Sequence, residues 1–180
     1  AFVINTAAKR KQNYSFDGNL LLIETMNWDP FTTWDSSSEF VEYLNDQKKF
    51  VNQLINESRQ ELVVRLHPGY KNDTWSEDIM WHDFDPSIKI DDGTSDITDL
   101  ISKSRLVVHS YDSTGILITL SQNVPTLAFW QNGFDHLRES AKPYYQTLVD
   151  AGIVHLSTES VSNKVNEIWD DVDGWWNQNH

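Results

Sequence analysis

Cysteine is absent from the 180 residues of the sequence. A disulfide framework, a thiol nucleophile and a thiolate metal site are therefore excluded, and the absence fits a reducing, cytoplasmic location. Basic residues are scarce, with 14 Lys and Arg against 27 Asp and Glu, which gives a formal net charge of −13. Such a field repels phosphate backbones and anionic lipids, so we expect no nucleic-acid partner and no direct membrane insertion. An anionic ligand would need a local site.

Long apolar runs and a secretory signal pattern are also missing. The same holds for HExxH, G-x-S-x-G, G-x-G-x-x-G and the P-loop motif, so zinc-peptidase, hydrolase, dinucleotide and P-loop functions lose their sequence support. Asp83 and Asp85 have a spacing that can chelate a divalent cation, but two acids beside a proline are also common in turns. We therefore expect no metal site and no tightly bound cofactor.

Hydrophobic residues make up 39% and aromatic residues 12% of the chain, a composition typical of a globular protein. At this length we expect a single domain over residues 1–180. The sequence begins with Ala1, without an initiator methionine, so we expect a processed chain or an excised piece of a longer protein.

Short apolar runs alternate with segments of helical periodicity along the chain. The runs predict strands over residues 20–25, 61–67, 87–90, 105–109, 126–130 and 153–156. The periodic segments predict helices over residues 36–59, 95–104, 116–123, 137–151 and 161–172, while residues 70–86 look irregular. This alternation predicts an α/β fold with an open, mostly parallel sheet and helices on both faces. Ligands of such sheets bind beyond the carboxyl ends of the strands.

Small polar residues follow the strand predicted over residues 105–109. Ser113, Thr114 and Gly115 lead from it into an apolar helix. A helix N-terminus offers unpaired N–H groups and partial positive charge, and Gly115 would let a phosphate approach the backbone. The segment therefore indicates a phosphate site, although Ser113 or Thr114 can equally serve as a simple helix cap.

A cationic group follows the strand predicted over residues 61–67. Arg65 and His67, with Pro68 beginning the turn, would suit a phosphate at the same edge of the sheet. The alternative is that Arg65 pairs with an acidic neighbour and His67 is a structural histidine. From sheet geometry alone, base or ribose contacts would come from the next turn and a donor contact from a later strand end. These candidates are Asp92, Gly93, Thr94 and Trp130.

An ordered series of segments carries a family resemblance over about residues 61–176. The series is Val64-Arg65-Leu66-His67-Pro68, Ser104-Arg105-Leu106-Val107-Val108, Ser113-Thr114-Gly115, Asn123-Val124-Pro125-Thr126 and Phe129-Trp130. It resembles the C-terminal half of GT-B-type glycosyltransferases, above all transferases of bacterial surface-polysaccharide clusters. The resemblance implies a Rossmann-like domain that binds a nucleotide-activated donor. It also implies that His67-Pro68 and Ser113-Thr114 contact the donor nucleotide.

In such transferases the N-terminal domain usually supplies the acceptor site and often the catalytic base. The resemblance therefore implies that this chain is a fragment of a two-domain glycosyltransferase or polyol-phosphate transferase of surface-polysaccharide synthesis, inactive alone and without an assigned catalytic residue. Two alternatives stay open. One is a nucleotide-sugar epimerase of related fold, and the other is a non-catalytic, flavodoxin-like interaction domain that binds a protein through aromatic loops around Trp28, Trp34, Trp75 and Trp81.

Overall fold

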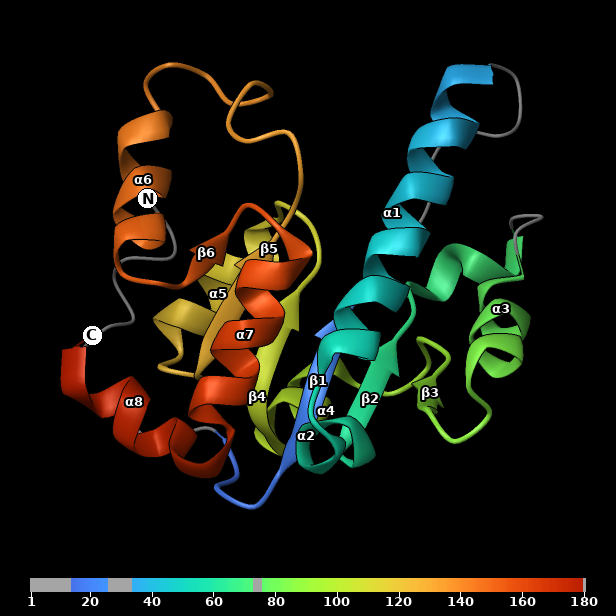
Figure 1. Cartoon of the computed structure of the whole chain (residues 1–180), viewed down its shortest axis with the longest axis horizontal. Helices are drawn as coiled ribbons and strands as arrows, with labels where there is room; N and C mark the ends of the chain where they lie inside the picture. Colours follow the sequence, from blue (N-terminus) through green and yellow to red (C-terminus); the bar gives the residue numbers. More distant parts are fainter. Residues whose placement is uncertain (1–13, 26–33, 73–75, 180) are drawn as a thin grey trace.

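A parallel sheet forms the centre of the protein (Figure 1). The computed structural model describes residues 14–25, 34–72 and 76–179. Within them the strands are β1 (Asn19–Ile23), β2 (Leu62–Arg65), β3 (Lys89–Asp91), β4 (Ser104–His109), β5 (Thr126–Phe129) and β6 (Val154–His155). They run in the order β3-β2-β1-β4-β5-β6, with every neighbouring pair parallel. The predicted α/β fold is confirmed as a Rossmann-like sheet, with its topological switch point between β1 and β4.

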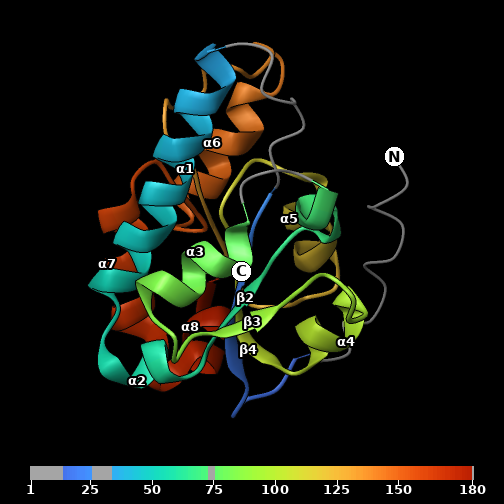
Figure 2. The same ribbon diagram turned by 90° about the vertical axis from the view of Figure 1, so that its right-hand side faces the viewer.

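Helices cover both faces of the sheet. They are α1 (Trp34–Gln53), α2 (Asn56–Gln60), α3 (Glu77–Phe84), α4 (Ile97–Ser102), α5 (Thr114–Ser121), α6 (Lys142–Asp150), α7 (Thr158–Ile168) and α8 (Val172–Asn179), with 3₁₀ turns at Pro68–Asn72 and Trp169–Asp171. Figure 2 shows α1, α3 and α7 on one side of the sheet and α4 and α5 on the other. Across the described ranges, no helix has the length and apolar character needed to cross a membrane.

Alternating side chains of the strands supply two apolar cores. Leu20 and Leu22 of β1 pack with α1, α3 and α7, whereas Leu21 packs with α4, α5 and the C-terminal helix. This alternation follows from the two-residue period of a strand. Because both faces are covered, the central strands are apolar without interruption over Leu20 to Leu22 and Leu106 to Val108, and the three leucines of β1 are at most 1% exposed.

The structure corrects two predicted elements on the α1 side. The single helix predicted over residues 36–59 is wrong, because α1 ends at Gln53 and α2 begins at Asn56. Asn166 of α7 bridges the break: its Nδ2 donates to the Gln53 carbonyl at 2.8 Å, and its Oδ1 accepts from the Ile55 N–H at 3.0 Å. The segment predicted to be irregular over residues 70–86 contains α3, whose Trp81 is 2% exposed.

The later elements keep their predicted order with shifted bounds. The strand predicted over residues 87–90 is observed as β3 at Lys89–Asp91, and the helix predicted over 137–151 begins only at Lys142. The residues between β5 and α6 form turns, with Asn132 and Gly133 both at positive φ. These turns extend past the carboxyl end of the sheet, where they form one wall of a cavity.

Candidate functional site

Two cavities lie at the carboxyl edge of the sheet, one on each side of the loop after β4. The first, named the α5 cavity, has a volume of about 290 Å³ and is lined by Ile97, His109, Ser113, Gly115 and Ile118 among others. The second, named the acidic cavity, has a volume of about 360 Å³ and is lined by Glu39, Glu42, Gln47, Asp112, Trp130 and His136 among others. Tyr111 lines both cavities. The two cavities therefore adjoin at the switch point of the sheet, the usual ligand position in this fold.

The N-terminal turn of α5 forms the polar end of the α5 cavity. Ser113 is the N-cap of the helix, and its Oγ accepts from the Gly115 N–H at 3.2 Å. The Ile116 N–H donates to the Ser113 carbonyl at 3.3 Å. The capping role that was one interpretation of Ser113 is thus present, and Thr114 is exposed beside it. The isoleucines of α4 and α5 make the rest of this wall apolar.

His109, the last residue of β4, lies beneath this turn. Its ring is 2% exposed, and burial lowers its pKa to about 4, so the imidazole is neutral at physiological pH. Nε2 lies 3.3 Å from the Thr119 Oγ1, whose own hydroxyl donates to helix carbonyls. With the Thr119 proton on one of these carbonyls, Nε2 is the donor to Thr119, and Nδ1 is then a buried acceptor without a hydrogen-bond partner among the described residues.

Gly115 allows the backbone of α5 to approach this imidazole. A Cβ placed on Gly115 would lie 2.9 Å from the His109 Cε1, closer than real Cβ contacts allow. The glycine therefore serves first to pack α5 against β4. Its second role, the admission of a phosphate, stays a prediction.

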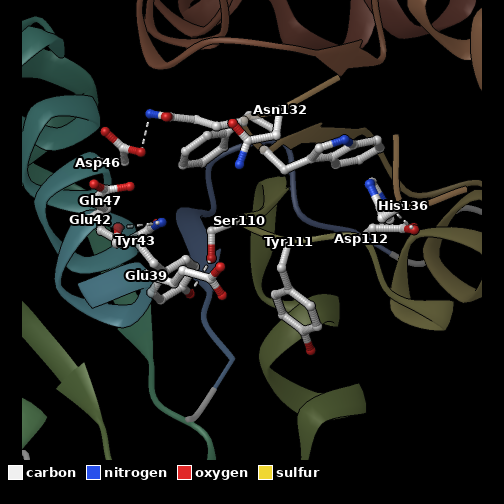
Figure 3. A pocket seen from close by; sticks show the side chains of 13 residues that line it. Glu39, Glu42, Tyr43, Asp46, Gln47, Ser110, Tyr111, Asp112, Asn132 and His136 are labelled. Carbon is white, nitrogen blue, oxygen red and sulfur yellow. Dashed lines mark hydrogen bonds and ion pairs between the residues drawn. The ribbon is translucent and has the colours of Figure 1, made fainter. Parts of the chain in front are cut away.

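Acidic side chains from α1 face the loop after β5 across the acidic cavity (Figure 3). Glu39 and Glu42 are exposed, whereas Asp46 is buried and accepts from Lys49 at 3.0 Å and from Gln131. On the opposite side, Asp112 accepts from the Tyr145 hydroxyl at 2.6 Å and lies 3.1 Å from the His136 Nε2. The predicted donor contact Trp130 lines this cavity, and its Nε1 donates to the Gly133 carbonyl at 2.9 Å.

The cationic residues predicted after β2 lie outside both cavities, in a cluster of their own at the β2–β3 end of the sheet. Arg65 pairs with Asp91 and donates to the Gly93 carbonyl at 2.9 Å, as the alternative interpretation of Arg65 requires. The His67 Nδ1 accepts from the Gly69 N–H at 3.0 Å, and burial followed by the charge of Arg65 lowers its pKa. Neither cavity lining includes these residues.

The turn after β3 closes this cluster. Asp92 pairs with Lys71 at 2.6 Å and accepts from the Thr94 hydroxyl at 2.6 Å. Gly93 has a φ of +86°, and a Cβ on it would lie 2.5 Å from the Pro68 Cα. The structure therefore brings Pro68 and Asp92 to Thr94 together with Arg65 and His67, and it places Ser113 to Gly115 in the α5 cavity.

Asp83 and Asp85, the acidic pair noted in the sequence, lie in two different environments. Asp85 accepts from Arg59 at 2.7 Å and from the Ser87 hydroxyl at 2.6 Å, while the Asp83 side chain is 76% exposed. Of the tryptophans assigned to a protein-binding surface, Trp28 and Trp75 lie outside the described residues. Trp81 is buried in the core, where its Nε1 donates to Glu24 at 3.1 Å.

Glu24, which follows β1 directly, was not among the residues predicted from the sequence. Glu24 is 2% exposed, and burial, followed by the negative charge of Glu77, raises the pKa of its carboxyl group to about 8. Beside it, the Tyr43 hydroxyl accepts from the Thr25 N–H at 3.0 Å and lies 2.7 Å from the Ser110 Oγ. The available signal in the sequence was a carboxylate near the end of the strand predicted over residues 20–25.

A family model described as LIC12162 family transferase matches residues 1–180. No curated protein matches the chain.

Proposed function

The chain belongs to the LIC12162 family of transferases, and on this premise we propose that it binds the nucleotide-activated donor of a transfer reaction. The transferred group is a glycosyl or polyol-phosphate unit, and the reaction serves surface-polysaccharide synthesis in the cytoplasm. The proposal combines transferase membership with a cavity at the switch point of a Rossmann-like sheet.

The α5 cavity is the proposed nucleotide site. The observation that carries this assignment is that His109, which lines the cavity, has a buried Nδ1 with no hydrogen-bond partner among the described residues. A ribose hydroxyl is a donor of the kind this nitrogen requires. The apolar wall of Ile97, Ile101 and Ile118 suits a nucleobase, because ligand pockets combine apolar walls with a few polar groups.

The donor phosphates would then lie over Ser113, Thr114 and Gly115. During transfer the departing phosphate gains negative charge, which the partial positive charge at the start of α5 stabilises. His67 and Pro68 would contribute from the adjacent cluster. Arg65 would act there mainly by holding the turn of Asp92, Gly93 and Thr94, since its guanidinium is already paired with Asp91.

Acceptor binding and the catalytic base belong in this proposal to a second domain outside the chain. We therefore expect residues 1–180 alone to bind the donor nucleotide but not to catalyse the transfer.

Thermal unfolding with CMP, CDP, UDP, GDP and ADP, each with and without Mg²⁺, tests the proposal. A nucleotide at a hundredfold excess over Kd should stabilise the protein by about 2.7 kcal/mol, which corresponds to about 5 to 10 °C in Tm. The informative variant is Ser113→Asp. Aspartate is a good N-cap, so the unliganded Tm should hold, while its negative charge should repel the phosphate and remove the nucleotide-induced shift.

Ser157→Asp is the matched control, because Ser157 caps α7 in the same way, with its Oγ accepting from the Ser160 N–H at 3.2 Å. This variant should keep the full nucleotide-induced shift. Equal shifts in wild type and Ser113→Asp would refute the phosphate assignment. No shift with any nucleotide, in this chain and in a longer protein that includes the second domain, would favour the interaction-domain alternative.

A further inference from the structure

The acidic cavity presents unpaired carboxylate acceptors to a ligand. Glu39 and Glu42 face it from adjacent turns of α1, and neither is in an ion pair with any residue that the structure describes. On the far wall, His136 and the Trp130 Nε1 are engaged with Asp112 and the Gly133 carbonyl, while Tyr111 and Asn132 also line the cavity. A ligand that satisfies the carboxylates of Glu39 and Glu42 must bring N–H or O–H groups.

Gln47 adds a second, independent hydrogen-bond acceptor to this cavity. Its side chain is 1% exposed, and its Nε2 donates to the Tyr43 carbonyl at 3.2 Å. That bond fixes the orientation of the amide and leaves Oε1 as a buried acceptor with no partner among the described residues. A buried acceptor without a donor is costly, so Gln47 is a built position that a ligand donor would satisfy.

The chemical class of the ligand follows from the geometry of the acidic cavity. The described part of the chain contains no group of three His, Cys, Asp or Glu side chains placed to hold a metal ion. A single small cation would also leave most of a cavity of about 360 Å³ unfilled. A ring with several hydroxyl or amine groups matches both the volume and the scattered acceptors.

We propose that the acidic cavity binds a glycosyl ring without negative charge, either a neutral sugar or an amino sugar, and rejects sugar acids. Because Tyr111 separates it from the α5 cavity, this ring would be the transferred part of the donor. That last assignment rests on the proposed function. Discrimination arises because Glu39 and Glu42 repel a ligand carboxylate, while each hydroxyl or amine gains an acceptor.

Saturation-transfer NMR on the full chain tests this with glucose, glucosamine and glucuronate at millimolar concentration. These probes share one ring and differ in charge. Glucose and glucosamine should receive saturation, and glucuronate should not. Gln47→Leu should weaken binding of the two bound sugars by about tenfold, the effect of losing one hydrogen bond.

Charge reversal provides a second test that does not depend on Gln47. The double variant Glu39→Lys, Glu42→Lys should admit glucuronate and weaken glucosamine binding at least tenfold. Glu57→Lys is the matched control, since Glu57 is an exposed acid of α2, at the other end of α1 from the cavity, and it should change neither preference. An amine-specific site would appear as glucosamine binding without glucose, which still supports a ring without negative charge.

Three results would overturn the inference: saturation of glucuronate equal to that of glucose, no saturation of any probe, or binding unaffected by both Gln47→Leu and the charge reversal. The nucleotide titrations on the same samples keep the two proposals distinct. Nucleotide binding without sugar binding overturns this inference alone. Sugar binding without nucleotide binding overturns the proposed nucleotide site and leaves the sugar cavity in place.

Discussion

At the scale of single residues, Glu24 makes the stability of the fold depend on pH around neutrality. Its carboxyl group is protonated at neutral pH because burial and the nearby charge of Glu77 raise its pKa from 4.5 to about 8. The folded state therefore binds more protons than the unfolded state between these two values. Stability contributed by this group is complete below pH 4.5 and declines as the pH rises towards 8.

Glu24→Gln should remove this dependence, because the amide keeps an acceptor for the Trp81 Nε1 and never ionises. Relative to wild type, the variant should gain several kcal/mol at pH 9 and little at pH 4.5, since a pKa difference of one corresponds to about 1.4 kcal/mol. Urea unfolding at the two pH values measures the difference. Glu57→Gln, at an exposed acid, should show no such trend. A gain for Glu24→Gln that is the same at both pH values would contradict the raised pKa.

His109 acts in the opposite direction on the acid side. Its folded pKa of about 4 lies below the usual 6.5, so its neutral form is favoured by the fold and stability is lost as the pH falls from 6.5 to 4. Between pH 4.5 and 6.5 the slopes of His109 and Glu24 oppose each other. Of these two groups, only Glu24 changes the stability between pH 6.5 and 8.

At the scale of elements, the break between α1 and α2 depends on one side chain. Asn166 satisfies both the Gln53 carbonyl and the Ile55 N–H. Asn166→Ala should therefore lower the free energy of unfolding by about 1 to 2 kcal/mol, the value of two partly exposed hydrogen bonds. Urea unfolding measures this, with Asn163→Ala on the exposed face of the same helix as control. Equal effects of the two substitutions would mean that the hydrogen bonds of Asn166 contribute nothing to the free energy of unfolding.

The same break shows where prediction from sequence ends. Apolar residues continue at helical spacing through Leu54 and Ile55, so periodicity alone gives one long helix. The residue that stabilises the break is 111 positions away from Ile55. The strands, in contrast, were predictable because Leu20 to Leu22 and Leu106 to Val108 are apolar without interruption, as double burial requires.

The two cavities of the candidate site also differ in how far the sequence could predict them. The α5 cavity was predictable in part, because Ser113 to Gly115 directly follow a strand and the rule for parallel sheets places such residues near a ligand. The acidic cavity was not, since Gln47 lies inside a helix and reaches the site only when α1 packs beside the loop after β5. No local pattern distinguishes Glu39 or Glu42 from other solvent-exposed helix residues.

At the scale of the whole molecule, the net charge of −13 should make stability depend on salt. Self-repulsion destabilises the compact state, and raising ionic strength from about 0.01 M to 0.15 M shortens the Debye length from about 30 to 8 Å. We expect a stabilisation of about 1 kcal/mol, or about 2 to 4 °C in Tm. Calorimetry in NaCl, with sucrose at equal osmolality for comparison, measures it. A Tm that falls with salt would mean that ion pairs such as Arg65–Asp91 outweigh the repulsion.

The position of β1 has a consequence for synthesis on the ribosome. This strand is made before the other five described strands, yet it lies in the middle of the sheet and pairs with β2 and β4. At about 5 to 20 residues per second, β4 emerges roughly 4 to 16 s after β1. During that interval the leucines at positions 20–22 have a strand edge with no native partner, which exposes them to pairing with other chains. The nascent protein should therefore need protection by a chaperone until His109 has left the exit tunnel.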